Sequence, residues 1–315
     1  MIEVPEKPVE ISSHALSPDT APLVSISCIT YNQEKYIREA IEGFLMQKTV
    51  FPVEILIHDD ASTDKTADII REYEAKYPLL IKPIYQTENQ FSQGNKPGKL
   101  NRIRARGTYI AMCEGDDYWT DPLKLQKQVS FLEANPEYSM VCTNFSVIDE
   151  NNNLISKWGW QGSKTTSYID QETILGRYTP KTLTVLLRNR CVLQIDPKFS
   201  AYRYPNGDVA FFSAVAEFGP CHFVNEITGT YRMTKSGIWA KKDMAQQLKM
   251  KIRTFKNLLL FYSDKKKLHK PIYNQLINMC RVVSIVSFKK AKLYDAGTYL
   301  MQYFYFKMRD SMDRR

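Results

Sequence analysis

The chain has 315 residues and is 43% hydrophobic, which is enough to bury one sizeable core and a smaller second unit. Its net charge of +9 comes from residues 241–315, which hold 18 Lys and Arg against 5 Asp and Glu and leave residues 1–240 slightly acidic. No segment approaches the roughly 20 apolar residues that span a bilayer, and the N-terminus lacks a signal-peptide pattern, so we expect a cytoplasmic protein.

The first part of the chain alternates strand and helix patterns. Residues 1–22 are polar with four prolines and are expected to be a mobile leader. Apolar runs at 24–30 and 53–60 predict strands, and the helical spacing at 34–47 between them completes a βαβ unit. A helix at 64–77 and strands at 81–86 and 107–114 follow. This alternation predicts a mostly parallel sheet with helices on both faces.

The second part is less regular. A helix at 121–136 and a strand at 138–149 come first, and the sheet is expected to become mixed there. Residues 154–232 predict shorter strands and one helix at 207–219. Beyond Gly237 the helical runs are 246–262, 273–294 and 297–315. The six cysteines form no CxxC pair, which predicts free, buried thiols.

Acidic residues gather where the predicted strands end. Ligands of open parallel sheets bind beyond the carboxyl ends of the strands. Asp64 and Asp121 are interpreted as helix caps, but capping does not explain Glu114, Asp116 and Asp117 together. Three carboxylates within four residues repel one another unless a cation lies among them, and oxygen ligands suit Mg²⁺ or Mn²⁺ rather than zinc.

Three ordered segments carry a family resemblance. SISCITYNQEKYIREAI, VEILIHDDASTDKT and YIAMCEGDDYWTDPLKLQKQ resemble the inverting family 2 glycosyltransferases with the GT-A fold, over about residues 23–240. The resemblance implies an α/β GT-A fold with a mixed, mostly parallel sheet and a C-terminal helical extension. It divides the chain into a leader (1–22), a catalytic domain (23–240, with its nucleotide-binding half at about 23–120 and its acceptor-side half at about 121–240) and a basic extension (241–315).

The resemblance also assigns donor-site residues. Asp60 falls on the Asp that reads the base, usually uracil. Glu114-Gly115-Asp116 falls on the family's DxD motif, with Glu114 near the ribose, Asp116 as the metal ligand and Asp117 beside it. The remaining donor-binding candidates are Thr30, Tyr31 and Asn32 after the first strand, Arg102 in the loop 87–106, and Arg232.

Several residues keep two interpretations. Asp208 resembles the family's catalytic base, and a helix N-cap is the alternative. Arg232 and Lys235 lie in a segment, 231–239, that resembles the family's closing YR…G..W segment; they pair either with diphosphate oxygens or with surface acids. Arg102 faces a phosphate or solvent. Trp119 stacks on a sugar or packs into the sheet edge, and His58 is expected to be a packed strand residue.

The predicted activity is transfer of a sugar, with inversion, from a nucleoside diphosphate sugar, UDP-linked by resemblance, to an acceptor hydroxyl. The acceptor is expected to be a glycan or lipid-linked glycan in bacterial surface polysaccharide or glycolipid assembly, at the inner membrane face. A nucleotidyltransferase would offer a Gly-rich loop where this chain reads TYNQEKY.

The alternative is a basic nucleic-acid- or membrane-binding protein with a silent glycosyltransferase-like domain, although the tail carries no nucleic-acid-binding motif and no nucleic-acid partner is expected. The basic helices of the tail either lie on an anionic membrane surface or pack as a bundle against residues 23–240.

Overall fold

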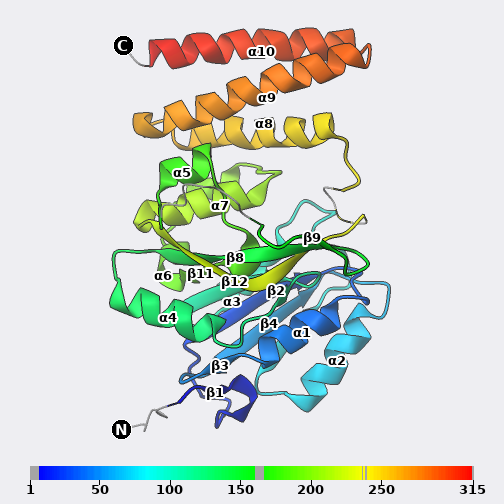
Figure 1. Cartoon of the computed structure of the whole chain (residues 1–315), viewed down its shortest axis with the longest axis vertical. Coiled ribbons are helices and arrows are strands. Elements are labelled where there is room, and N and C mark those ends of the chain that lie inside the picture. Colours follow the sequence, from blue (N-terminus) through cyan, green and yellow to red (C-terminus); the bar gives the residue numbers. More distant parts are fainter. Residues whose placement is uncertain (1–6, 160–166, 236, 238–239, 314–315) are drawn as a thin grey trace. The chain divides into compact units, whose positions relative to one another are not determined.

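The computed structural model describes residues 7–159, 167–235, 237 and 240–313 (Figure 1). The chain divides into two compact units. The first comprises Met1–Tyr168, Lys181–Gln194 and Cys221–Met233, and the second comprises Ile169–Pro180, Ile195–Pro220 and Thr234–Arg315. The expected boundary near residue 240 is therefore not where the structure divides, because residues 195–220 belong with the helical tail. Ser236, Ile238 and Trp239 of the expected closing segment lie outside the described residues.

A sheet forms the centre of the first unit. Four strands run parallel in the order β6-β2-β4-β5, and their bounds are Tyr109–Glu114, Val24–Thr30, Val53–Asp59 and Ile81–Tyr85. Each matches an apolar run of the sequence, as expected for parallel strands that helices cover on both faces. Because the register pairs Thr30 with Asp59 and Ile29 with Glu114, the polar strand ends come together at one edge.

The sheet becomes mixed beyond β6, as predicted. Strand β11 (Leu186–Arg188) lies antiparallel between β6 and β8 (Met140–Asp149), and β12 (Cys221–Met233) runs parallel to β8. Two short strands, β7 (Tyr118–Trp119) and β9 (Leu154–Ser156), pair antiparallel with β12 and β8. At 13 residues β12 is longer than the short strands expected here.

Helices α1, α2 and α4 of the first unit start and end close to the predicted positions, whereas α3 lies in the segment expected to be a loop and α6 was not predicted. Helix α3 follows the loop after β5. Its residue Asn101 has no exposed surface. The Asn101 Nδ2 donates hydrogen bonds to the carbonyls of Cys28 (2.8 Å) and Leu56 (3.1 Å), which attaches α3 to β2 and β4. The bounds are α1 Ile37–Leu45, α2 Thr66–Lys76, α3 Pro97–Arg104, α4 Lys124–Ala134 and α6 Asn189–Leu193.

The expectation of a mobile leader is corrected for the residues around Ile11. Strand β1 (Val9–Glu10) pairs antiparallel with β3 (Lys48–Thr49), and the Ile11 amide donates a 2.9 Å hydrogen bond to the Gln47 carbonyl. The Ile11 side chain is fully buried in the hydrophobic core. A single isoleucine in a polar, proline-rich segment carries no periodic pattern, so the sequence did not indicate that it packs.

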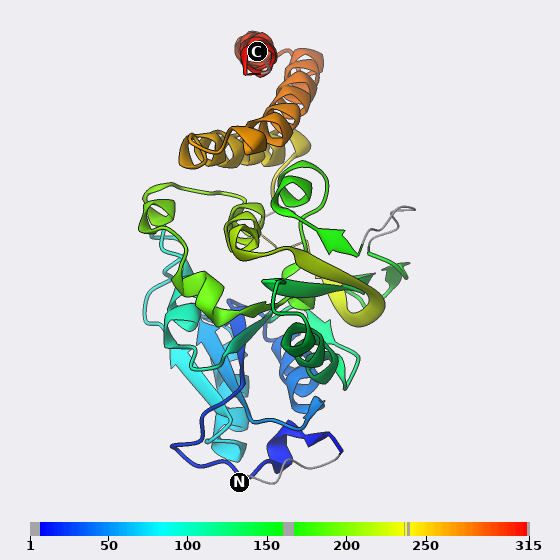
Figure 2. The same ribbon diagram turned by 90° about the vertical axis from the view of Figure 1, so that its left-hand side faces the viewer.

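The second unit is built of helices, and strand β10 (Tyr168–Ile169) lies where the chain enters it. Helix α8 begins with a capping box in which Asp243 and Gln246 bond each other's backbone amides. Helices α8, α9 and α10 stack in that order, and α9 and α8 also contact α5 and α7 (Figures 1 and 2). The bounds are α5 Gln171–Gly176, α7 Gly207–Val215, α8 Met244–Phe261, α9 His269–Lys289 and α10 Leu293–Met312.

The core of this helical unit consists of apolar residues from α8 and α9. Leu258, Ile272, Leu276, Cys280 and Val283 have no exposed surface. Among the described residues, no helix combines the length and the hydrophobicity that crossing a membrane requires. All six cysteines of the chain are free and buried, as the sequence predicted.

Candidate active site

The carboxyl end of β6 carries the three acids that the sequence singled out. Glu114 and Asp116 are partly exposed, whereas Asp117 is 2% exposed. Burial raises the pKa of Asp117 well above its usual range, and the neighbouring Asp116 and Glu114 carboxylates add to this shift. Burial also raises the pKa of Asp116. The acids therefore lie close enough to repel one another, as predicted from their spacing.

Gly115 lets this acidic turn approach the end of β2. Its amide donates a 3.0 Å hydrogen bond to the Ile29 carbonyl. A Cβ at Gly115 would lie 2.6 Å from Gln33 Oε1 and 2.8 Å from Thr30 Oγ1, which is too close for any side chain. Thr30 is buried and donates a 2.7 Å hydrogen bond to Gln33 Oε1. Thr30 thus packs against the turn that carries Glu114 and Asp116.

Arg232 holds the acidic turn from the β12 side. Its amide donates a 2.8 Å hydrogen bond to Asp117 Oδ1, and its Nε donates a 3.1 Å bond to the Asp116 carbonyl. The guanidinium also bonds the side chains of Glu39 on α1 and Asn152.

The Arg232 guanidinium is therefore committed to partners within the protein. Its side chain is only 1% exposed. The expected pairing of Arg232 with diphosphate oxygens is corrected to a buried network that fixes the backbone around Asp116.

Lys181 is a cation of this site that the sequence analysis missed. Its Nζ lies 3.9 Å from the centre of the Tyr231 ring. Burial raises the pKa of both Asp116 and Asp117, and the Lys181 charge partly opposes this rise, which places the ammonium group near these carboxylates. The Thr184 amide and hydroxyl bond the Lys181 carbonyl at 2.9 and 2.7 Å. No sequence motif marks Lys181, because the fold alone brings it to the end of β6.

Asp60 follows β4 and is 2% exposed. Its two carboxylate oxygens accept hydrogen bonds from the amides of Gln90 (2.8 Å) and Phe91 (3.0 Å), in the loop after β5. The His58 Nε2 lies 3.6 Å from Asp60 Oδ1, and burial lowers the pKa of this fully buried histidine. His58 is thus a packed strand residue, as predicted. Asp60 thus holds the loop after β5 against the end of β4.

The turn after β2 is bonded to the turn after β4. Asn32 adopts a positive φ of 51°, and its side-chain oxygen accepts a 2.8 Å bond from the Thr63 amide. Tyr31 beside it is 45% exposed. Asp64 accepts a 2.9 Å bond from the Thr66 amide at the start of α2, and Asp121 accepts one of 2.9 Å from Leu123 before α4. The N-cap positions of α2 and α4 are Lys65 and Leu123, so the helix-cap interpretation of Asp64 and Asp121 is corrected: each acid bonds the amide two residues further along, just before or at the start of its helix.

Arg102 lies on α3 and is partly buried, and burial lowers its pKa to about 10. In the second unit, Asp208 is exposed in the first turn of α7. The N-cap of α7 is Asn206, so Asp208 is not the capping residue that the alternative interpretation required. An acid in the first turn is favoured by the helix dipole, and Asp208 is exposed to solvent there.

Trp119 packs into the structure and does not present a free face. It is 1% exposed, its Nε1 donates a 2.8 Å bond to the Leu183 carbonyl, and its ring meets Phe44 edge-on. The packing alternative is therefore confirmed.

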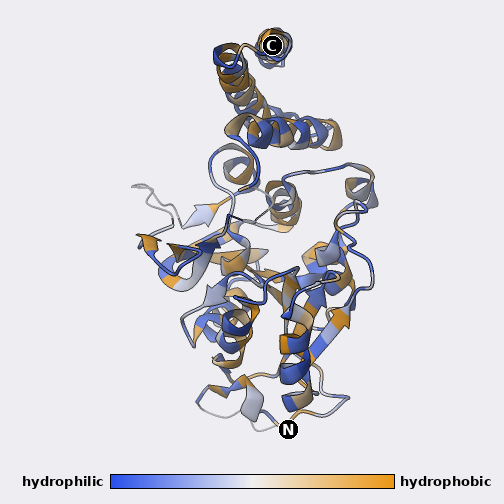
Figure 3. Ribbon diagram, turned by 90° about the vertical axis from the view of Figure 1, so that its right-hand side faces the viewer, coloured by the Kyte–Doolittle hydropathy of each residue, from blue (hydrophilic) through white to orange (hydrophobic). Residues whose placement is uncertain are grey.

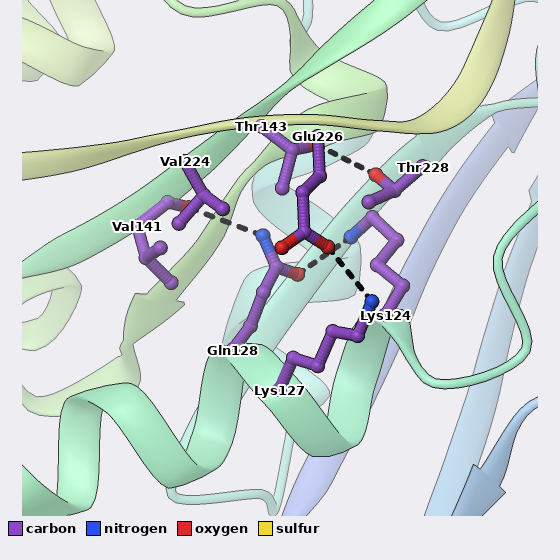
Figure 4. Close-up of a pocket in the computed structure, with 8 residues that line it drawn as sticks. All are labelled: Lys124, Lys127, Gln128, Val141, Thr143, Val224, Glu226 and Thr228. Atoms are coloured by element: carbon purple, nitrogen blue, oxygen red, sulfur yellow. Dashed lines mark hydrogen bonds and ion pairs between the residues drawn. The ribbon is translucent and has the colours of Figure 1, made fainter. Parts of the chain in front are cut away.

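Lys124 is buried beneath Trp119, with its Nζ 4.3 Å from the centre of the indole ring and 2.7 Å from Gln128 Oε1. It borders a cavity of about 30 Å³, room for about one water (Figure 4). Burial lowers the pKa of Lys124 to about 7.

The residues at the end of β6 fit a hard divalent cation. In the described part of the chain, no group of three or more His, Cys, Asp or Glu side chains is arranged to enclose a metal. Glu114 and Asp116 nevertheless offer partly exposed carboxylates. Mg²⁺ and Mn²⁺ in nucleotide sites are commonly held by one or two carboxylates plus phosphate oxygens, so an incomplete protein shell is what such a site requires.

A mixed, mostly parallel sheet whose strands end in these acids is the arrangement of the GT-A fold, and the comparisons agree. The sequence model of glycosyl transferase family 2 matches residues 25–190, more than half of the chain. The chain belongs to glycosyl transferase family 2.

Among the relatives, uncharacterised proteins of Mycobacterium tuberculosis are 53% identical over 128 residues, which cover 41% of this chain and 36% of theirs. The chain thus matches about a third of their length. A Bacillus subtilis protein named as a proposed teichuronic acid biosynthesis glycosyltransferase, TuaG, is 29% identical over 225 residues, or 70% of this chain and 83% of TuaG.

Two solved structures share the fold at low identity. The mannosyltransferase PcManGT of Pyrobaculum calidifontis, in complex with GDP-Man and Mn²⁺, has a TM-score of 0.54 at 15% identity and covers 96% of this chain and 87% of its own. S. aureus TarS in complex with UDP-GlcNAc has a TM-score of 0.52 at 16% identity and covers 90% and 91%.

Proposed function

We propose that this glycosyltransferase uses a UDP-linked sugar and transfers it with inversion to an acceptor hydroxyl. The observation that carries the proposal is the convergence of Glu114, Asp116 and Lys181 at the end of β6, next to the end of β2. Carboxylates for a cation and an ammonium group for phosphate oxygens are the groups that a nucleoside diphosphate needs.

Each donor-site residue has a proposed part. Asp60 accepts a hydrogen bond from the base, Glu114 contacts the ribose, and Asp116 holds Mg²⁺ or Mn²⁺, with Asp117 and Arg232 fixing its backbone. A bound divalent cation supplies positive charge that neutralises the departing diphosphate. Lys181 contributes a second positive charge. The other donor-binding candidates are Thr30, Tyr31, Asn32 and Arg102.

Asp208 is the proposed catalytic base. The acceptor oxygen attacks the anomeric carbon, the bond from that carbon to the diphosphate oxygen breaks, and the Asp208 carboxylate takes the hydroxyl proton. A single displacement of this kind inverts the anomeric configuration. The exposed position of Asp208 in the first turn of α7 supports the proposal, because a base must reach an incoming hydroxyl.

The acceptor is proposed to be a glycan or lipid-linked glycan of bacterial surface polysaccharide or glycolipid assembly, at the cytoplasmic face of the membrane. The similarity to TuaG, whose name refers to teichuronic acid biosynthesis, supports this class. The UDP-GlcNAc complex of TarS supports uridine, whereas PcManGT was solved with GDP-Man. The identity of the base is therefore the first point to test.

The test is donor hydrolysis by the full-length protein with Mn²⁺, over a panel of UDP-, GDP- and dTDP-sugars, with UDP and GDP affinity measured by calorimetry. We expect hydrolysis of one or more UDP-sugars and loss of this activity in Asp116→Asn. Preference for GDP-sugars would overturn the uridine assignment but keep the metal site. Absence of both hydrolysis and nucleotide binding would favour the silent-domain alternative.

A further inference from the structure

Helix α10 has one face packed inside the second unit. Ala296, Phe306 and Asp310 are buried on this inner face. The Phe306 ring lies 6.3 Å from the Tyr273 ring of α9, and Ser284 Oγ donates a 2.8 Å bond to the Ala296 carbonyl. The packed side of α10 is therefore settled by its contacts with α9.

The opposite face of α10 is apolar and exposed. At 100° per residue, eight large hydrophobic side chains fall in an arc of about 140° centred opposite the inner face. Each is between 46% and 87% exposed. The arc contains no charged residue, and its only other members are Gly297 and Ser311. We call this the outer face, and its residues are Leu293, Tyr294, Leu300, Met301, Phe304, Tyr305, Met308 and Met312.

Such a face differs from scattered surface hydrophobics. Isolated exposed apolar residues are normal, but an apolar stripe without charged residues along the 20 residues of α10 marks an interaction surface. Figure 3 shows hydrophobic and hydrophilic residues side by side along the tail helices, and Figure 2 shows α10 beyond α9 on the side away from α8.

Positive charge borders the outer face. On the helical wheel Lys307 and Arg309 flank the apolar arc, one on each side; Lys307 is exposed, whereas the Arg309 guanidinium bonds Tyr273 of α9. Exposed lysines lie at the end of α9 and in the turn before α10, namely Lys289, Lys290 and Lys292, of which Lys290 pairs with Asp243 at 3.0 Å.

The acids nearby are drawn to the inner side of the helix. Asp295 pairs with Lys249 of α8 at 2.6 Å, and Asp313 bonds His269 of α9 at 3.0 Å. The rim of the outer face is consequently basic.

We propose that the outer face of α10 docks this protein on an anionic bilayer surface, with the apolar stripe among the acyl chains and the basic rim at the lipid headgroups. An apolar face between basic borders is the pattern of interfacial helices. A second copy fits less well, because an antiparallel two-fold contact through this face would place the Lys307 side chains of both copies on the same side of the contact. Lipid phosphates would instead neutralise them.

The test is co-sedimentation of the full-length protein with phosphatidylcholine vesicles that contain or lack phosphatidylglycerol. We expect binding to the anionic vesicles that weakens as salt rises. The double variant Phe304→Ser, Met308→Ser should lower the partition coefficient by roughly tenfold or more. Leu260→Ser is the matched control, since Leu260 is 58% exposed on α8 and lies outside the outer face.

The outcomes separate the alternatives. Failure of the wild type to bind anionic vesicles at low salt would overturn the proposal, as would unchanged binding by the double variant. If the wild type is instead a dimer that the double variant dissociates, with no vesicle binding, the face is a self-association surface. Circular dichroism checks that both variants fold. Donor hydrolysis should be equal in all three proteins, so the result is independent of the proposed donor chemistry.

Discussion

The backbone amide of Arg232 on β12 donates a 2.8 Å hydrogen bond to the carboxylate of Asp117, which lies 115 residues earlier in the chain. The Arg232 side chain extends past this contact to the Asp116 carbonyl and on to Glu39 and Asn152. One residue thus connects α1, the acidic turn and the turn before β9.

Arg232→Lys should destabilise the protein and lower kcat, because lysine cannot reproduce the several directed bonds of the guanidinium. Removing this network should cost about 1–3 kcal/mol in free energy of unfolding, discounted because the Glu39 side chain is 44% exposed. Urea titration measures the loss. An equally stable variant with only weakened UDP binding would restore the diphosphate role for Arg232.

Asp116→Asn should abolish Mn²⁺-dependent turnover, since a neutral amide is a poor ligand for a hard cation. We expect kcat to fall by roughly 10²-fold or more while the melting temperature stays near that of the wild type. Asp68→Asn, which neutralises a 71% exposed acid on α2, is the control and should keep full activity. Full wild-type turnover in EDTA would contradict the metal role.

Lys181→Met should weaken UDP binding, because the ammonium group near Asp116 and Asp117 would no longer reach the diphosphate. Loss of one charged hydrogen bond predicts a Kd about 10- to 100-fold higher by calorimetry. Lys48→Met, at an exposed lysine of β3, is the matched control. Equal UDP affinity in the two variants would remove Lys181 from the donor site.

Asp208→Asn should lower the rate of the chemical step by roughly 10²-fold while leaving donor affinity unchanged, since only the proton acceptor is lost. Single-turnover kinetics and UDP calorimetry measure the two quantities separately. A parallel loss of UDP affinity would give Asp208 a binding role instead.

Lys124 should make stability depend on pH. Its pKa is lowered from 10.5 to about 7 in the folded protein, so between these values the unfolded chain binds a proton that the folded chain does not. The free energy of unfolding therefore gains a contribution that rises with pH across this window, by at most about 1.4 kcal/mol per pH unit, and that is constant below pH 7.

Lys124→Met should remove this contribution. Urea titrations of wild type and variant at pH 7 and pH 9 measure this contribution as a difference in the free energy of unfolding. The contributions of the thiols and phenols, which both proteins share, cancel in that difference. The stability of the wild type relative to Lys124→Met should rise at pH 9, whereas its stability relative to Lys48→Met should not. Parallel pH profiles for wild type and Lys124→Met would show that Lys124 is charged in the folded state.

The sequence by itself determined the alternating strands and helices, the acids at the end of β6, and the family. These are local features, because the side-chain period and the position after a strand can be read within a few residues. Only the tertiary structure decided that Ile11 enters the core, that Arg232 is buried against Asp116, that Lys181 joins the acids, and which face of α10 remains exposed. Each of these depends on which distant segments become neighbours in the folded chain. Strand order and helix packing decide which segments those are, and both result from hydrophobic burial over the whole chain.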